Sequence, residues 1–327
     1  MKIAFFGTAG FCPTHNSCGV IIDTLVAAGY KPVVLVTAND KPAGKKQQLT
    51  PPLAKLTALK HGIEIIQSEK LNKDVILRVQ KINPDVIILA AYGILVPKEI
   101  LEIPKYGALC VHPSLLPQFR GPSPVQNAIL EGKKETGITV IKMDQEIDHG
   151  PIIAQKQLPI LGKPTVLELS EQLAPLAGNL LIEIIPKLAS GEIILQEQDD
   201  SKATYTKIFE KKDGAIDWNN SAVYIERQVR ALNPWPSTYT KFKIQNSKSE
   251  TNSKFKILKI LKASVLEQTK RSLVKRGLVF LTQDKKIAVH TGKDALVIEK
   301  LQLEGGKAMN ARDFILGYRG FIGIILE

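Results

Sequence analysis

The sequence predicts an α/β protein with two domains: a doubly wound, mainly parallel sheet of Rossmann-like type, followed by a smaller C-terminal β-barrel of OB-like type. Strand-length apolar runs alternate with helical patterns in the first half of the chain, as parallel sheets with crossover helices require. The run Val86–Ala90 is apolar at every position, which indicates a strand buried on both faces. The last third carries short alternating segments between polar stretches, which is typical of small barrels.

The first domain is predicted over residues 1–195, with elements assigned from the apolar period. The expected strands are Lys2–Phe6, Val33–Thr37, Glu64–Ile66, Val86–Ala90, Ala108–Val111, Val140–Met143 and Ile152–Ala154. The expected helices are Gly19–Ala28, Ala54–His61, Lys73–Ile82 and Val166–Leu188. Asn83 and Pro84 end the third helix, and Pro175 is expected to interrupt the fourth. Ligands of such sheets bind beyond the carboxyl ends of the strands.

A polar linker is predicted over residues 196–206, and a basic barrel domain over residues 207–327. The expected strands of the barrel are Ser237–Ile244, Phe255–Leu261, Leu278–Leu281, Ile287–His290 and Ala295–Leu303. The polar stretch Gln245–Lys254 is expected to form a hairpin tip.

Composition narrows the class of protein. With 327 residues and 44% apolar content, the chain can bury a sizeable core. Its three cysteines, in a sequence without a secretory leader, indicate a reducing compartment and therefore a cytoplasmic protein. No apolar run reaches the length expected of a membrane span, so we expect no membrane partner, and we expect a monomer. The spacing of Cys12, His15 and Cys18 fits no zinc pattern, and no metal is predicted.

The net charge of +12 is distributed unevenly along the chain. Residues 1–206 carry a net charge of +1, whereas residues 207–327 carry +11. A near-neutral domain joined to a strongly basic one is typical of proteins that bind a polyanion such as nucleic acid. A lysine-rich surface that only keeps the protein soluble would show the same excess, so charge alone leaves both interpretations open.

The turn after the first strand reads GTAGFCPTHNSCG. It lacks the G-x-G-x-x-G spacing of dinucleotide-binding turns, and the chain contains no P-loop. A nicotinamide cofactor is therefore not indicated.

The densest group of chemically useful residues lies between Gly107 and Gly150. His112 directly follows an apolar strand, which puts it at the sheet edge where a site is expected. Asp148 lies in an I-D-H-G turn after another strand and can reach back across that edge. A histidine and a carboxylate are the minimal pair for moving a proton during acyl transfer. A loop histidine beside an ordinary turn aspartate would show the same pattern.

Several ordered motifs resemble the folate-dependent formyltransferases. The segment HPSLLPQFRGPSPVQNAI is similar to the main signature of that family, and IDHGPII is similar to its second signature. The segments AAYGILVPKEIL, ALNPWPSTYT, DKPAGKKQQLTPP and GGKAM resemble, more narrowly, the methionyl-tRNA formyltransferases. The likeness extends over nearly the whole chain in the right order.

The resemblance implies a catalytic trio of asparagine, histidine and aspartate, which carries over to His112 and Asp148. The asparagine position is occupied by Cys110, a weaker hydrogen-bond donor. In the family, the asparagine and histidine donate to the developing oxyanion, and the aspartate charges and orients the histidine. Three consequences remain open here: a slower enzyme, a substitute donor such as Ser114, a backbone N–H or water, or loss of the chemistry. Covalent transfer through Cys110 is a further interpretation, although direct transfer needs no such intermediate.

The resemblance also implies binding sites. The donor 10-formyltetrahydrofolate, a co-substrate, would lie against a slot of main chain and apolar side chains. The residues implied for folate are Tyr92, Gly93, Ile94, Leu95, Ser114, Leu115, Leu116, Pro117, Met143, Asp144 and Ile147. Those implied for tRNA are Lys41, Lys45, Lys46, Lys207, Lys211, Lys241 and Lys243. The first loop, Ala9–Gly19, departs from the family pattern beside the expected acceptor site.

The function that the resemblance implies is transfer of a formyl group to the amino group of methionyl initiator tRNA, by direct attack through a tetrahedral intermediate. One alternative is a formyltransferase for a small amine, such as an amino sugar or a nucleotide, which would need no basic platform. The other is a tRNA-binding homologue impaired in catalysis by Cys110.

Overall fold

The structure is a computed structural model that describes residues 1–12, 14–44, 47–243, 255–267 and 274–327. It divides into two compact units. The first contains residues 1–128 and 133–208, and the second contains residues 129–132 and 209–327. The segment predicted as a linker, residues 196–206, lies within the first unit.

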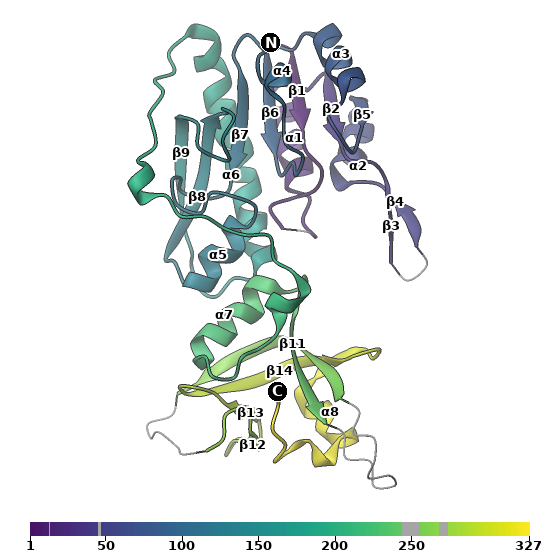
Figure 1. Cartoon of the computed structure of the whole chain (residues 1–327), viewed down its shortest axis with the longest axis vertical. Helices are drawn as coiled ribbons and strands as arrows, with labels where there is room; N and C mark the ends of the chain where they lie inside the picture. The colour runs from purple at the N-terminus through teal and green to yellow at the C-terminus, as the bar shows by residue number, and fades with distance from the viewer. Residues whose placement is uncertain (13, 45–46, 244–254, 268–273) are drawn as a thin grey trace. The chain divides into compact units, whose positions relative to one another are not determined.

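The first unit is built on a seven-stranded sheet with the order β5-β2-β1-β6-β7-β8-β9 (Figure 1). The first five strands of this order run parallel, while β8 is antiparallel to β7 and β9 is antiparallel to β8. The strands are β1 (Ile3–Phe6), β2 (Val34–Thr37), β5 (Glu64–Gln67), β6 (Val86–Ala90), β7 (Ala108–His112), β8 (Glu135–Lys142) and β9 (Ile152–Pro159). The helices are α1 (Ser17–Ala27), α2 (Leu53–Lys60), α3 (Lys73–Ile82), α4 (Lys98–Leu101), α5 (Pro124–Glu131) and α6 (Val166–Ser190).

Strands β1, β2 and β6 are buried along their whole length because helices cover both faces of the sheet. Alternate residues such as Phe6 and Leu89 pack in one cluster with Val79 of α3 and Ile100 of α4. Helices α1 and α6 pack against each other, and α6 also contacts β8 and β9. This arrangement confirms the doubly wound, mainly parallel fold predicted from the apolar strands.

Helix α6 differs from the prediction, because Pro175 does not interrupt it. The helix runs without a break through Pro175 and Pro186. Both prolines are exposed, so the carbonyl groups that they leave unpaired face solvent, while Ala174, Ala177 and Ile185 hold the opposite face in the core. By length and composition alone this helix could cross a membrane, contrary to the sequence expectation, but half of its apolar window is buried inside the protein.

A small hairpin not predicted from sequence follows β2. It consists of β3 (Lys41–Ala43) and β4 (Gln48–Thr50), which pair antiparallel and form a separate two-stranded sheet. It lies within the segment DKPAGKKQQLTPP, and the side chains of Lys45 and Lys46 fall outside the described residues.

The second unit is an antiparallel half-barrel sheet with the order β10-β11-β14-β13-β12, and β15 pairs with β14. Its elements are η2 (Lys211–Gly214), α7 (Ala222–Leu232), β10 (Thr238–Lys243), β11 (Phe255–Leu266), β12 (Val279–Leu281), β13 (Ile287–His290), β14 (Ala295–Leu303), β15 (Ala308–Asn310), α8 (Ala311–Gly317) and η3 (Arg319–Phe321). Phe242, Phe314 and Phe321 meet edge to face at its core. The predicted hairpin tip 245–254 lies outside the described residues.

Candidate active site

The candidate site lies where β7 ends in the middle of the sheet. Residues two apart on a strand face the same side, so β7 presents Cys110 and His112 together. Cys110 is held in register by both β6 and β8, and His112 by Thr139 of β8. The carboxyl ends of the parallel strands form the edge at which the sequence analysis expected a site.

The hydrogen bonds of His112 define what its ring can do. The side chain is buried, and Nε2 lies 2.8 Å from the carbonyl oxygen of Phe119. A carbonyl only accepts hydrogen bonds, so Nε2 carries a proton. Nδ1 lies 3.5 Å from Oδ2 of Asp148, which is close enough for an ion pair when the ring is protonated. Proton exchange at this imidazole is therefore confined to Nδ1, on the side of Asp148.

Asp148 lies on the turn between β8 and β9 with a left-handed backbone, φ 52°. Its Oδ2 accepts a hydrogen bond from the backbone N–H of Gly121 at 2.8 Å. Its Oδ1 lies 3.9 Å from Sγ of Cys110. Aspartate tolerates this backbone region better than most residues, but the conformation still costs about 1–2 kcal/mol. The structure thus brings all three predicted catalytic residues together around one carboxylate.

Cys110 is a poor nucleophile in this environment. Burial, followed by the adjacent Asp148 carboxylate, raises the pKa of the Cys110 thiol well above its ordinary value. Only the thiolate is a strong nucleophile, so a neutral thiol argues against covalent formyl transfer through this residue. Ser114 does not replace the missing asparagine either, because its hydroxyl donates to the carbonyl oxygen of Gln118 at 2.7 Å.

The residues implied for the folate ring surround the ends of β6 and β8. The hydroxyl of Tyr92 is buried without a hydrogen-bond partner, and the ring packs edge to face on Phe6. Leu95 and Ile147 are 81% and 65% exposed, which is high for large apolar side chains. A buried hydroxyl without a partner and exposed apolar side chains are the kinds of group that line a site for a flat, hydrogen-bonding ligand.

The remaining folate candidates have structural partners of several kinds. Met143 packs against the core beside α3 and α4, and Asp144 accepts from His149. The backbone N–H of Leu116 donates to Thr139. Gly93 and Ile94 lie in the loop after β6, and Pro117 lies in the loop after β7. Their side chains carry no hydrogen-bonding group.

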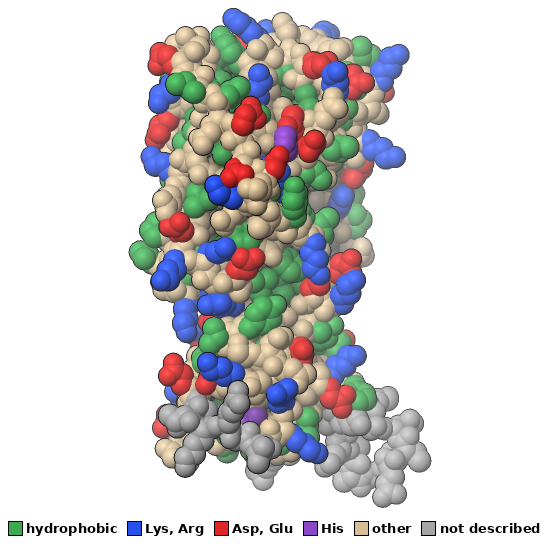
Figure 2. Space-filling view, turned by 60° about the vertical axis from the view of Figure 1, so that its left-hand side comes forward, with side chains coloured by type: hydrophobic (Ala, Val, Ile, Leu, Met, Phe, Trp, Pro, Cys, Tyr) green, Lys and Arg blue, Asp and Glu red, His purple; other side chains and the backbone are tan. Residues whose placement is uncertain are grey.

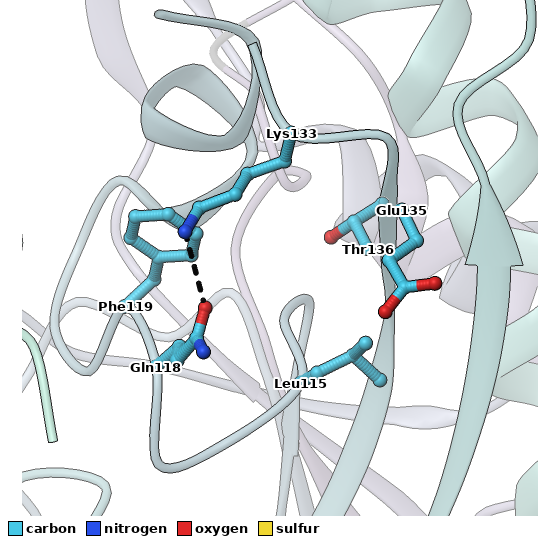
Figure 3. Close-up of a pocket in the computed structure, with 6 residues that line it drawn as sticks. All are labelled: Leu115, Gln118, Phe119, Lys133, Glu135 and Thr136. Atoms are coloured by element: carbon cyan, nitrogen blue, oxygen red, sulfur yellow. Dashed lines mark hydrogen bonds between the residues drawn. The ribbon is translucent and has the colours of Figure 1, made fainter. Parts of the chain in front are cut away.

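Leu115 lines a cavity of about 240 Å³ together with Gln118, Phe119, Lys133, Glu135 and Thr136 (Figure 3). The ring of Phe119 borders this cavity, while its backbone carbonyl oxygen accepts a hydrogen bond from Nε2 of His112.

The lysines implied for tRNA are spread over both units. Lys41 and Lys207 are exposed on the first unit, where Lys41 pairs with Glu69 at 3.4 Å. Lys211 and Lys241 are exposed on the second unit. Lys45 and Lys46 lie outside the described residues, as does the side chain of Lys243. Figure 2 shows basic and acidic side chains interspersed over its visible face, rather than a stripe of one sign.

Two residues near the site were missed by the sequence analysis. Arg120 belongs to the quoted signature but was given no role, and it is only 2% exposed. Gln198 lies in the segment expected to be a linker, and its side-chain amide contacts the backbone of the Asp148 turn. A buried arginine in a motif could have been noticed, whereas nothing local in the sequence distinguishes Gln198. Among the described residues, no group of three or more His, Cys, Asp or Glu side chains is arranged to hold a metal ion.

Comparisons with known proteins identify the family of the chain. A family model described as formyl transferase matches residues 1–185, and a model described as the formyl transferase C-terminal domain matches residues 208–319. The chain is 38% identical to a methionyl-tRNA formyltransferase of Caldicellulosiruptor saccharolyticus, over 100% of both chains. It is 36% identical to that of Bacillus subtilis, over 99% of this chain and 97% of the relative.

Solved structures at low identity share the fold. HypX from Aquifex aeolicus, solved with tetrahydrofolic acid, has a TM-score of 0.63 at 16% identity, and the match covers 98% of this chain but only 48% of HypX. The N-formyltransferase from Helicobacter canadensis, solved with folinic acid and dTDP-3-aminofucose, has a TM-score of 0.61 at 16% identity, covering 91% and 98% of the two chains. On the family matches and the full-length relatives, the chain belongs to the methionyl-tRNA formyltransferase family and is a formyl-transferring enzyme.

Proposed function

We propose that the enzyme transfers the formyl group of 10-formyltetrahydrofolate to the amino group of methionine carried on initiator tRNA, in the cytoplasm. The observation that carries this proposal is the pairing of His112 Nδ1 with the Asp148 carboxylate at the carboxyl end of β7. Full-length relatives named for this reaction supply the substrate class.

The proposed chemistry follows from the two ring nitrogens. The carbonyl oxygen of Phe119 holds one proton on Nε2. Nδ1 is therefore the ring nitrogen that can receive or donate the proton moved in the reaction. As the substrate nitrogen forms its bond to the formyl carbon, it releases a proton toward the His112–Asp148 pair. The charged ring then stabilises the developing oxyanion through Nδ1–H. When the bond between the formyl carbon and the folate nitrogen breaks, the His112–Asp148 pair passes this proton to the leaving folate nitrogen and the formyl C=O re-forms.

Cys110 stands where a strong oxyanion donor is expected. Its thiol proton is directed toward Asp148 rather than free, and a thiol is a weak donor in any case. Removal of one oxyanion donor typically costs about 10²–10³ in rate. We therefore propose that the enzyme is active but slow relative to a form with asparagine at this position.

The donor would lie against Tyr92, Leu95 and Ile147. The unpartnered Tyr92 hydroxyl offers the buried polar group, and the two exposed aliphatic side chains offer the apolar wall. The folate supplies the formyl group, and these residues would orient the folate. The basic C-terminal part of the chain, residues 207–327, would hold the tRNA backbone.

A steady-state formylation assay on purified protein tests the proposal. With Met-tRNA and 10-formyltetrahydrofolate, we expect slow turnover by the wild type and about 10²-fold faster turnover by Cys110→Asn. His112→Ala should lose at least about 10²-fold in turnover while binding folate nearly as well, because the ring moves a proton but does not line the folate wall.

The outcomes separate the alternatives. If neither the wild type nor Cys110→Asn formylates Met-tRNA while both bind it, the chain is a tRNA-binding homologue and the enzyme proposal fails. Formylation of a small amine, such as an amino sugar, in preference to Met-tRNA would identify the other alternative. Unchanged turnover in His112→Ala would refute the assignment of the catalytic histidine.

A further inference from the structure

We propose that Gln198 is the positioning residue for Asp148, and that the buried Arg120 holds Gln198 in place. This inference rests on the proposed function, because it concerns the carboxylate to which that function assigns proton transfer. It gives a role to the segment that the sequence predicts to be only a linker.

The Asp148 turn needs support from outside. Its left-handed backbone is strained for a residue with a side chain, and such strain persists only where the surroundings hold it. One carboxylate oxygen, Oδ2, must also accept from Gly121 N–H and stay within reach of His112 Nδ1. A small rotation of this turn would move the carboxylate away from the imidazole.

Gln198 supplies that support through its amide nitrogen. Nε2 lies 2.8 Å from the carbonyl oxygen of Asp148, 2.9 Å from that of His149 and 2.8 Å from that of Gly150. Two amide protons are therefore shared among three successive carbonyl groups. All three carbonyls must face the same point for this contact to exist, so the contact fixes the rotation of the turn.

Arg120 determines which end of the Gln198 amide faces the turn. Its Nε and Nη2 lie 3.1 and 2.9 Å from Oε1 of Gln198, and Nη2 is also 2.7 Å from Oδ1 of Asp200. A guanidinium only donates and the turn carbonyls only accept, so the amide has a single orientation that satisfies both sides. The arginine is buried, so its own rotation is restricted.

Backbone hydrogen bonds hold the two segments together. Arg120 N donates to Thr204 O and Thr206 N donates to Arg120 O, each at 2.8 Å. Gln196 exchanges two backbone hydrogen bonds with Ile152, two residues beyond Gly150. The loop bearing Gly121, the turn bearing Asp148 and the segment bearing Gln198 therefore form one closed network.

Gln198→Glu tests this role with nearly the same side-chain shape. The carboxylate keeps its attraction to Arg120 but has no protons for the turn carbonyls, which it repels. The neighbouring change Glu197→Gln, at an exposed side chain, is the matched control. We expect kcat to fall about tenfold to a hundredfold in Gln198→Glu, as for a small misplacement of a catalytic group. KM for both substrates should change less than about threefold, and the control should match the wild type.

A double-mutant comparison separates positioning from general destabilisation. If Gln198 acts through Asp148, adding Gln198→Glu to Asp148→Asn should lower kcat by less than about twofold further. Full multiplicative loss in the double variant would overturn the proposal. So would an unchanged kcat in the single variant.

Hydrogen exchange at the Gly121 amide gives a readout that needs no activity. This amide donates to Asp148, so it should exchange at least about tenfold faster in Gln198→Glu than in Glu197→Gln. Equal exchange in both variants would overturn the positioning role, even in an active enzyme. A wild type that formylates no amine would instead defeat the proposed function, while faster exchange at Gly121 would still show that Gln198 holds the turn.

Discussion

At the scale of single residues, the buried thiol of Cys18 is kept in its neutral form near the candidate site. Cys18, in the first turn of α1, donates its thiol proton to the carbonyl oxygen of Ala90 at 3.0 Å. Ala90 is the last residue of β6, directly before the loop that carries Tyr92. This contact therefore ties the altered first loop to the predicted folate slot. Burial raises the pKa of the Cys18 thiol to about 12.

The raised pKa of Cys18 predicts a specific loss of stability at alkaline pH. The ordinary value is 9.0, so the stabilising effect is complete below pH 9 and is lost as the pH rises from 9 toward 12. Each pH unit in this window costs about 1.4 kcal/mol of unfolding free energy. Cys18→Ser keeps a donor for Ala90 but does not ionise there. Between pH 8.5 and 10.5, urea unfolding should show the wild type losing about 2 kcal/mol relative to this variant. An equal pH dependence of the unfolding free energy in the wild type and in Cys18→Ser would contradict this prediction.

At the scale of elements, the first unit depends on close packing of α1 against α6. Gly178 lies in the buried face of α6, and a Cβ placed there would come 2.7 Å from Cβ of Thr24 on α1. That atom is near the backbone and cannot swing away as the end of a long side chain could. The glycine is thus required by the approach of the two helices rather than by a turn.

Gly178→Ala is expected to destabilise the protein, although alanine is the better helix former by about 1 kcal/mol. Overpacking of a well-packed contact costs about 1–3 kcal/mol, which outweighs the gain in propensity. Asn179→Ala, at the exposed neighbour on the same helix, is the control and should be neutral or slightly stabilising. Thermal unfolding of both variants measures the difference. A rise in melting temperature for Gly178→Ala would show that the two helices are not in tight contact.

At the scale of the whole molecule, the net charge differs sharply between the two parts of the chain. The excess of basic residues lies almost entirely in residues 207–327. Interactions between many lysines and a phosphate backbone release counterions, and their strength falls steeply as salt rises. A site for a small amine would not require this.

Binding of Met-tRNA is therefore expected to weaken at least tenfold between about 50 and about 200 mM salt. Affinity for 10-formyltetrahydrofolate should change far less, because its proposed contacts are mainly apolar walls and one buried hydroxyl. Filter binding of labelled Met-tRNA and fluorescence titration of folate measure the two. Affinity for tRNA that does not depend on salt would contradict a phosphate-binding role for the basic unit.

The sequence by itself determined the parallel sheet, the antiparallel barrel-like unit and the family. Apolar periodicity is local, so strands such as Val86–Ala90 and helices such as Lys73–Ile82 are readable from consecutive residues. The meeting of His112 and Asp148 was expected from their places near two strands, but β8 ends beside the amino end of β7, and only the path of the turn after β8 brings Asp148 to the imidazole. The predicted break at Pro175 was wrong because the exposure of one helix face depends on what covers the other.

Only the tertiary structure decided which partner each site residue has. Gln198 and Asp148 are 50 positions apart, and nothing local marks a glutamine in a polar segment as the donor to a distant turn. The proton on Nε2 of His112 is likewise set by a carbonyl seven residues away, through the path of the loop between them. Such contacts join residues that are not neighbours in the sequence. Local sequence patterns do not predict them, because only the packing of the folded chain brings the groups together.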